Sequence, residues 1–65
     1  MSTYTNLKDA YEEELKALRH YEQWAAAAQD PAIKEMFLQF GKNESWHAAA
    51  LREKIQMFEK DGREE

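Results

Sequence analysis

Hydrophobic side chains recur along this chain in steps of three and four residues, which is the spacing of one face of an α-helix. The first stripe comprises Leu7, Tyr11, Glu14, Leu18, Tyr21, Ala25 and Ala28. The second stripe comprises Ile33, Phe37, Phe40, Glu44, His47, Leu51, Ile55 and Phe58. This pattern predicts two helices, each with one face that packs against another helix.

The break between the two stripes is marked by Asp30 and Pro31. An aspartate that caps a helix, followed by proline at the first helical position, is a common helix start. Thr5 or Asn6 can cap the first helix, and Gly62 offers a stop for the second one. The sequence therefore predicts that the chain turns back on itself near Asp30.

Composition supports an all-helical fold, because β-branched residues are few and valine is absent. We predict a single all-α domain over residues 1–65, a two-helix antiparallel hairpin with helices over about 6–28 and 31–60. A chain of 65 residues rarely builds a sufficient core alone, and the absence of cysteine excludes disulfides and thiolate metal sites. Metal bound by nitrogen and oxygen ligands, or self-association, remains as a source of stability.

Charge and hydropathy exclude several classes of partner. The net charge is −4 and the isoelectric point is near 5.1, without the clustered basic face of a nucleic-acid-binding protein. No apolar run approaches the roughly 20 residues that cross a bilayer, and the first ten residues lack the features of a signal peptide. We therefore expect a cytoplasmic protein with neither a nucleic-acid nor a membrane partner.

Three ionisable residues interrupt the two apolar stripes: Glu14, Glu44 and His47. Burying a carboxylate among apolar side chains costs several kcal/mol unless it is paired, protonated or bound to a metal. Glu14 lies about fifteen residues before the turn, and the other two lie about fifteen and seventeen residues after it, so all three reach one height in a hairpin. The pattern predicts that their side chains converge.

A carboxylate from one helix with Glu-x-x-His from another is half of the ligand set by which some helical bundles bind two iron or two manganese ions. Two copies about a two-fold axis would supply four glutamates and two histidines, which balance two divalent cations. A polar layer that fixes the register of the bundle is the alternative interpretation of Glu14, Glu44 and His47. We interpret His20 as an ordinary surface histidine, and the following as packing or subunit-contact residues: Trp24, Met36, Trp46 and Met57.

The chain resembles the encapsulated ferritins, the short ferritin-like proteins carried inside encapsulin nanocompartments, and more widely the metal-binding hairpin of rubrerythrin and ferritin. The shared positions, with the same spacing and no gap, are Glu14-Leu15, Ala17, Tyr21, Asp30-Pro31, Glu44, His47 and Ala48. This resemblance covers about residues 13–51. It implies a homodimer that completes a ferritin-like four-helix bundle, with dimers joined into a ring.

The resemblance also implies roles for individual residues. Glu14, Glu44 and His47 become iron ligands at a ferroxidase centre between two subunits, Tyr21 lies beside them, and Glu13 resembles a carboxylate at the iron entry side. It further implies an encapsulin shell protein as a partner. The chain departs from the family at Lys16, where a second entry-side acid is usual, and nothing after Lys60 resembles a shell-docking peptide.

We therefore expect a ferroxidase that oxidises Fe(II) at a di-iron centre for iron storage or detoxification, with manganese as the other metal that fits. Two alternatives remain open. One is a rubrerythrin-like protein that consumes peroxide and needs an electron donor that this chain does not contain. The other is a non-catalytic helical hairpin that serves assembly alone.

Overall fold

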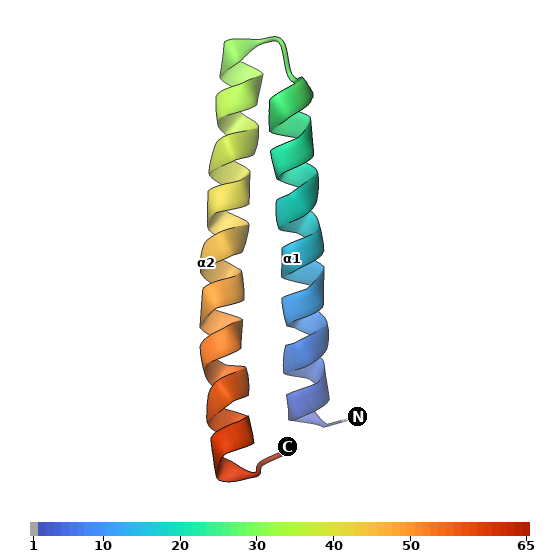
Figure 1. Ribbon diagram of the computed structural model, residues 1–65, viewed down its shortest axis with the longest axis vertical. Coiled ribbons are helices and arrows are strands. Elements are labelled where there is room, and N and C mark those ends of the chain that lie inside the picture. The colour runs from blue at the N-terminus through green and yellow to red at the C-terminus, as the bar shows by residue number, and fades with distance from the viewer. Residues whose placement is uncertain (1) are drawn as a thin grey trace.

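The computed structural model describes residues 2–65 and confirms the predicted hairpin. Helix α1 (Thr3–Ala27) and helix α2 (Pro31–Asp61) run antiparallel beside each other, and a short turn joins them (Figure 1). Next to the turn, Lys34 Nζ donates a hydrogen bond of 3.1 Å to the carbonyl oxygen of Ala25. No strand is present among the described residues.

Helix α1 begins earlier than the sequence predicted. Ser2 is its N-cap, and the Ser2 side chain accepts a hydrogen bond of 3.1 Å from the backbone N–H of Thr5. The prediction of a cap at Thr5 or Asn6 is wrong, because a serine upstream already satisfies the orphan N–H groups of the first turn. The helix ends at Ala27, and Ala28 has an extended backbone.

The start and end of α2 follow the predicted signals. Asp30 Oδ1 accepts hydrogen bonds from the N–H groups of Ala32 at 2.8 Å and Ile33 at 3.3 Å, and Pro31 occupies the first turn. Gly62 caps the C-terminus with a φ of 67°, a left-handed conformation that costs glycine little. These local signals place the turn and therefore the register between the two helices.

The seam between the helices differs from the predicted stripe in α2. Gly41 and Ala48 are buried there, whereas Phe40 and His47, which the sequence placed on the seam, are exposed to one side of it. A Cβ atom built on Gly41 would lie 3.5 Å from Leu18 Cδ1. The helices therefore approach closely at the small residues, and the larger neighbouring side chains are displaced toward solvent.

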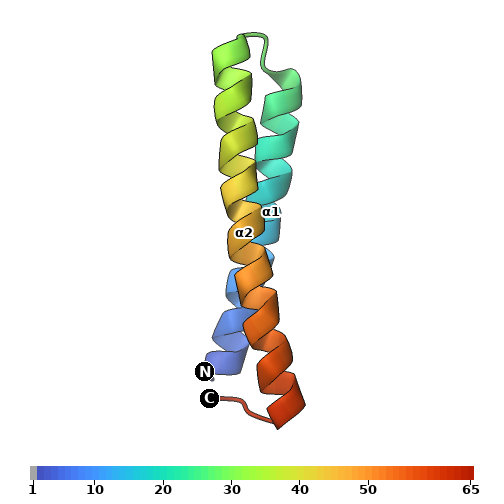
Figure 2. The same cartoon turned by 90° about the vertical axis from the view of Figure 1, so that its left-hand side faces the viewer.

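The hairpin is long and thin, with principal extents of 47 × 17 × 11 Å (Figures 1 and 2). Its radius of gyration is 14.7 Å, whereas a compact domain of this length has about 11 Å. Its accessible surface is 4978 Å², whereas a monomer of this mass normally exposes about 4,300 Å². One hairpin therefore leaves surface that association could cover. Neither helix of residues 2–65 has an apolar stretch that could cross a membrane.

Hydrogen bonds link the two helices at the end of the hairpin away from the turn. The hydroxyl of Tyr4 donates a hydrogen bond of 2.6 Å to Glu59 Oε2, and the Tyr4 N–H donates one of 2.7 Å to the carbonyl oxygen of Glu64. The guanidinium of Arg63 lies 4.4 Å from the centre of the Phe58 ring. The last residues thus fold back toward the start of α1, and both ends of the chain lie at this end of the hairpin (Figure 1).

Candidate metal centre

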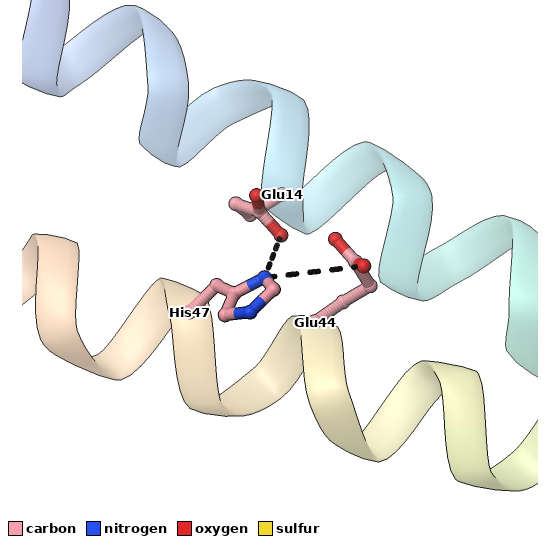
Figure 3. A group of neighbouring side chains, drawn as sticks. All are labelled: Glu14, Glu44 and His47. Atoms are coloured by element: carbon pink, nitrogen blue, oxygen red, sulfur yellow. Dashed lines mark ion pairs between the residues drawn. The ribbon is translucent and has the colours of Figure 1, made fainter.

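The three ionisable residues of the apolar stripes meet midway along the hairpin. Glu14 projects from α1, while Glu44 and His47, one helical turn apart, project from α2 (Figure 3). His47 Nδ1 lies 3.4 Å from Glu14 Oε2 and 4.0 Å from Glu44 Oε1. One ligand atom from each residue falls within 4.8 Å of the others. The predicted convergence of these side chains is confirmed.

The two carboxyl groups are only partly exposed, with 24% of the Glu14 side chain and 22% of the Glu44 side chain accessible. Glu14 Oε2 is buried and has no hydrogen-bond partner among residues 2–65. Hydrogen bonding to Glu14 raises the pKa of the Glu44 carboxyl, burial and the Glu14 charge raise it further, and His47 opposes the rise. The hairpin thus holds two acids close together at an electrostatic cost that a cation would remove.

His47 closes the group on one side and leaves it open on the other. Its side chain is 60% exposed, because Ala48 rather than His47 occupies the seam. The imidazole therefore lies on the flank of the hairpin that also carries exposed Phe40. We call this flank the metal face; it comprises Ala17, Tyr21, Trp24, Met36, Phe40 and His47, which share one side of the hairpin at roughly 100° of rotation per residue.

Tyr21 lies in an aromatic cluster on the turn side of the acidic group. Its ring centre is 5.6 Å from that of Phe40, 5.7 Å from that of Trp24 and 6.2 Å from that of Phe37. The cluster was not predicted as a unit. The signal that could have found it is the pair of i, i+3 aromatic spacings, Tyr21 with Trp24 and Phe37 with Phe40.

Two other residues considered from the sequence lie outside the group. Glu13 is exposed and forms its ion pair, at 3.7 Å, with Lys16 on the same helix. Such an exposed pair contributes little to stability. His20 is exposed, and its ring stacks on that of Trp24 with 5.2 Å between ring centres. Neither Glu13 nor His20 is brought to the ligand atoms of Glu14 and its neighbours.

Comparison with known protein families decides how this hairpin is classified. The family model described as Rubrerythrin matches residues 5–65, nearly the whole chain. The chain belongs to the Rubrerythrin family. No curated protein and no solved structure matches it significantly. Rubrerythrin-like domains are ferritin-like and bind iron, and the matched residues include the two carboxylates and the imidazole described above.

The donor set of this Rubrerythrin-family chain fits iron. Carboxylate oxygens and an imidazole nitrogen suit iron and manganese, and the absence of cysteine leaves no soft ligand for copper(I). Glu14 Oε2 is buried, lies 3.4 Å from His47 Nδ1 and accepts no hydrogen bond from residues 2–65, and a cation would satisfy such an atom. Glu14, Glu44 and His47 are therefore the residues that would hold the metal, and each hairpin offers three ligands.

Proposed function

We propose that two copies of this chain pair through their metal faces and oxidise Fe(II) to Fe(III) at a di-iron centre built from both. The observation that carries the proposal is the group of ligand atoms from Glu14, Glu44 and His47 within 4.8 Å, on a flank that one hairpin leaves open. Three ligands per chain leave an iron coordination sphere incomplete, and four carboxylates in a pair balance two divalent ions.

The distribution of side-chain size on the metal face supports an antiparallel pair. On the turn side of the acidic group this face carries large side chains, among them Phe40, which is 39% exposed. On the other side of the acidic group, beyond the residues that define the metal face, Ala10 and Ala50 lie at a similar distance from the group. A two-fold axis through the acidic group therefore sets Phe40 of each copy against the alanines of the other, which fills space on both sides of the centre.

Each residue of the proposed centre has a distinct role. Glu14 and Glu44 are anionic ligands, and their charge stabilises Fe(III) relative to Fe(II), which favours the loss of one electron from each iron to dioxygen or peroxide. His47 supplies a neutral nitrogen, so the ligand charge stays at two per chain. The ring of Tyr21 packs in the aromatic cluster beside the centre and excludes water from its turn side.

Aerobic oxidation of added Fe(II) tests the proposal directly. The wild-type chain should bind about one iron per chain and oxidise Fe(II) faster than buffer, while Glu14→Ala, Glu44→Ala and His47→Ala should each lose most of this rate. Glu12→Ala is the matched control, because Glu12 is an exposed carboxylate on the same turn of α1. Equal rates for the wild type and the three ligand variants would overturn the proposal.

A second candidate function follows from the Rubrerythrin family match, namely reduction of peroxide with electrons from another protein. The chain has no cysteine and so no thiolate-bound iron that could relay electrons to the centre. Repeated peroxide consumption should then require an added reductant. Peroxide turnover that is faster than Fe(II) oxidation under that condition would favour this function over the ferroxidase.

The resemblance to encapsulated ferritins supports iron storage or detoxification as the purpose of the oxidation, with an encapsulin shell as a partner. Manganese fits the same donors, so metal analysis of protein purified from its own cells should distinguish the two metals. Stoichiometric manganese without iron would contradict the iron assignment and leave the paired ligand set intact.

A further inference from the structure

The ring of His47 has a second nitrogen that the hairpin leaves without a partner. Nδ1 lies 3.4 Å from the Glu14 carboxyl and 4.0 Å from the Glu44 carboxyl, so it is the nitrogen that would bind the metal. Nε2 forms no hydrogen bond with residues 2–65. A histidine that binds a metal through one ring nitrogen carries a proton on the other, and this N–H is donated to an acceptor that fixes the orientation of the ring. One hairpin therefore supplies the ligand atom of His47 without the acceptor.

Asn43 is a polar residue on the same side of α2 as two residues of the metal face, Phe40 and His47. Positions 36, 40, 43 and 47 follow one another in steps of four, three and four residues, which keeps them on one side of the helix. Asn43 is exposed, and its Oδ1 accepts a hydrogen bond of 3.4 Å from Gln39 Nε2. Because a carbonyl oxygen has two lone pairs, this atom can accept a second hydrogen bond.

The proposed antiparallel pairing brings Asn43 of one copy to His47 of the other. That pairing sets Phe40 of each copy against Ala50 of the other copy. Asn43 follows Phe40 by three residues, and His47 precedes Ala50 by three residues. The same register therefore places Asn43 and His47 opposite each other on facing α2 helices, and the two-fold axis repeats the contact once for each imidazole.

We propose that Asn43 Oδ1 of each copy accepts a hydrogen bond from the Nε2–H of His47 in the other copy and thereby positions that imidazole as a metal ligand. The inference rests on the proposed pairing and names a residue that acts across it. Asn43 does not contact the metal in this arrangement, so it is a positioning residue. Its carbonyl holds the proton of the neutral imidazole at Nε2, which leaves the lone pair of Nδ1 free for the metal.

A neutral acceptor suits the charge of the proposed centre. The four carboxylates of a pair already balance two divalent ions, and a fifth and sixth carboxylate beside the imidazoles would leave excess negative charge at the contact. In a single hairpin the His47 side chain is 60% exposed and its Nε2 has no acceptor among the described residues. Pairing therefore supplies each metal with ligands from the second chain and also fixes the ring of its own histidine.

NMR of the His47 ring nitrogens tests this contact without any iron oxidation. Zn(II) is the probe ion, because it is diamagnetic and accepts carboxylate and imidazole ligands. Zinc-loaded wild-type pairs should show a resonance of the His47 Nε2–H that exchanges slowly with water. Asn43→Leu keeps the approximate shape of the side chain without its acceptor. This variant should lose the resonance at an unchanged pair mass and bind Fe(II) on the order of tenfold more weakly in the absence of oxygen.

Two further variants separate the hydrogen bond from a general effect of substitution. Asn43→Asp supplies a new acceptor at the same position and should restore the slowly exchanging resonance. Asn6→Leu is the matched control, because it makes the same change as Asn43→Leu at an exposed asparagine in the first turn of α1. It should leave both the resonance and the affinity for Fe(II) unchanged.

Mixed pairs distinguish a contact between copies from one within a chain, since Asn43 and His47 are also one turn apart on the same helix. Asn43→Leu chains labelled with ¹⁵N are combined with unlabelled His47→Ala chains. The labelled His47 then faces an intact Asn43 of the other copy, so its resonance should return. An unchanged resonance in Asn43→Leu pairs, or no resonance in the mixed pairs, would overturn the role of Asn43 alone. Wild-type chains that stay single when loaded would overturn the proposed pairing and this contact with it.

Discussion

Glu14 and Glu44 face each other from opposite helices, and the carboxyl of Glu14 raises the pKa of Glu44 through a hydrogen bond, with burial and charge adding to the effect. His47 lies beside both, with its Nδ1 3.4 Å from the Glu14 carboxyl and 4.0 Å from the Glu44 carboxyl. Without a cation, the proximity of the two carboxyl groups thus lowers the stability of the fold. A site that is costly when empty and favourable when filled couples metal binding to folding.

Glu44→Gln is expected to make the metal-free protein more stable at neutral pH, because it removes the charge whose pKa the fold raises. Since the folded pKa lies above the ordinary value, the stability linked to Glu44 is complete below that ordinary value and is lost as the pH rises through the raised one. Urea unfolding of metal-free protein should show wild type and variant converging as the pH is lowered.

The same variant should bind iron on the order of 100-fold more weakly, because an amide carries no negative charge to attract the cation. Glu13→Gln is the control for both measurements, since Glu13 is exposed and pairs only with Lys16. A metal-free Glu44→Gln protein that is less stable than wild type at neutral pH would contradict the electrostatic account.

Substitution by alanine should change Tm in opposite directions at the two glycines. At Gly41 a Cβ would meet Leu18 and Tyr21 at 3.5 and 3.6 Å, which are ordinary van der Waals distances, and alanine is favoured in a helix by about 0.5–1 kcal/mol. Gly62 has a φ of 67°, where a Cβ costs about 1–2 kcal/mol. Thermal unfolding should therefore show Gly41→Ala raising Tm and Gly62→Ala lowering it. A lowered Tm for Gly41→Ala would mean that the seam is tighter than described.

The Tyr4 hydroxyl should lose its proton at a higher pH than an ordinary tyrosine, because its hydrogen bond to Glu59 raises its pKa. The stability linked to a raised pKa is present below the ordinary value of 10.0 and is lost as the pH rises through the raised value. NMR titration should place the pKa of the Tyr4 hydroxyl above the ordinary value. Glu59→Gln should lower the Tyr4 value, and an unchanged value in that variant would exclude the hydrogen bond as its cause.

Thermal stability should depend on protein concentration, because one hairpin buries few large side chains. Among residues 2–65 the buried hydrophobic residues are Ala25, Ala48 and Phe58. Pairing removes further apolar surface from water, and by mass action a tenfold higher concentration should raise Tm by a few degrees. Differential scanning calorimetry over a concentration series measures this shift.

Phe40→Glu should abolish the dependence of Tm on protein concentration. It should weaken pairing about 100-fold or more, because it buries a charge in the metal-face contact. Gln23→Glu adds the same charge on the polar outer side of α1 and should leave the dependence intact. A Tm that does not vary with wild-type concentration would show that the isolated hairpin is the folded unit.

The helices, their antiparallel order and the meeting of Glu14 with Glu44 and His47 could be predicted from the sequence because local signals determine them. Asp30 and Pro31 fix where the chain turns, and that turn alone sets which residues share a height. The start of α1 was missed because Ser2 caps it one turn before the expected residues.

The sequence could not predict the rotation of α2 about its own axis closely enough to decide which of two adjacent residues faces α1. Positions 40 and 41, like positions 47 and 48, are separated by roughly 100°, and both flank the same seam. The close approach of the helices selects Gly41 and Ala48, which sequence periodicity alone does not reveal. That rotation leaves His47 at the edge of the hairpin, where a second chain can reach it.

Both chain ends lie at the end of the hairpin away from the turn. This position limits how two copies of the chain could be fused into one polypeptide that still forms the proposed centre. In an antiparallel pair, the last residue of one copy and the first described residue of the other would lie at opposite ends of an object about 47 Å long. A covalent linker would need at least about 14 extended residues to run the whole length. Fusion of two such genes would therefore create a four-helix protein with one long crossover between its second and third helices.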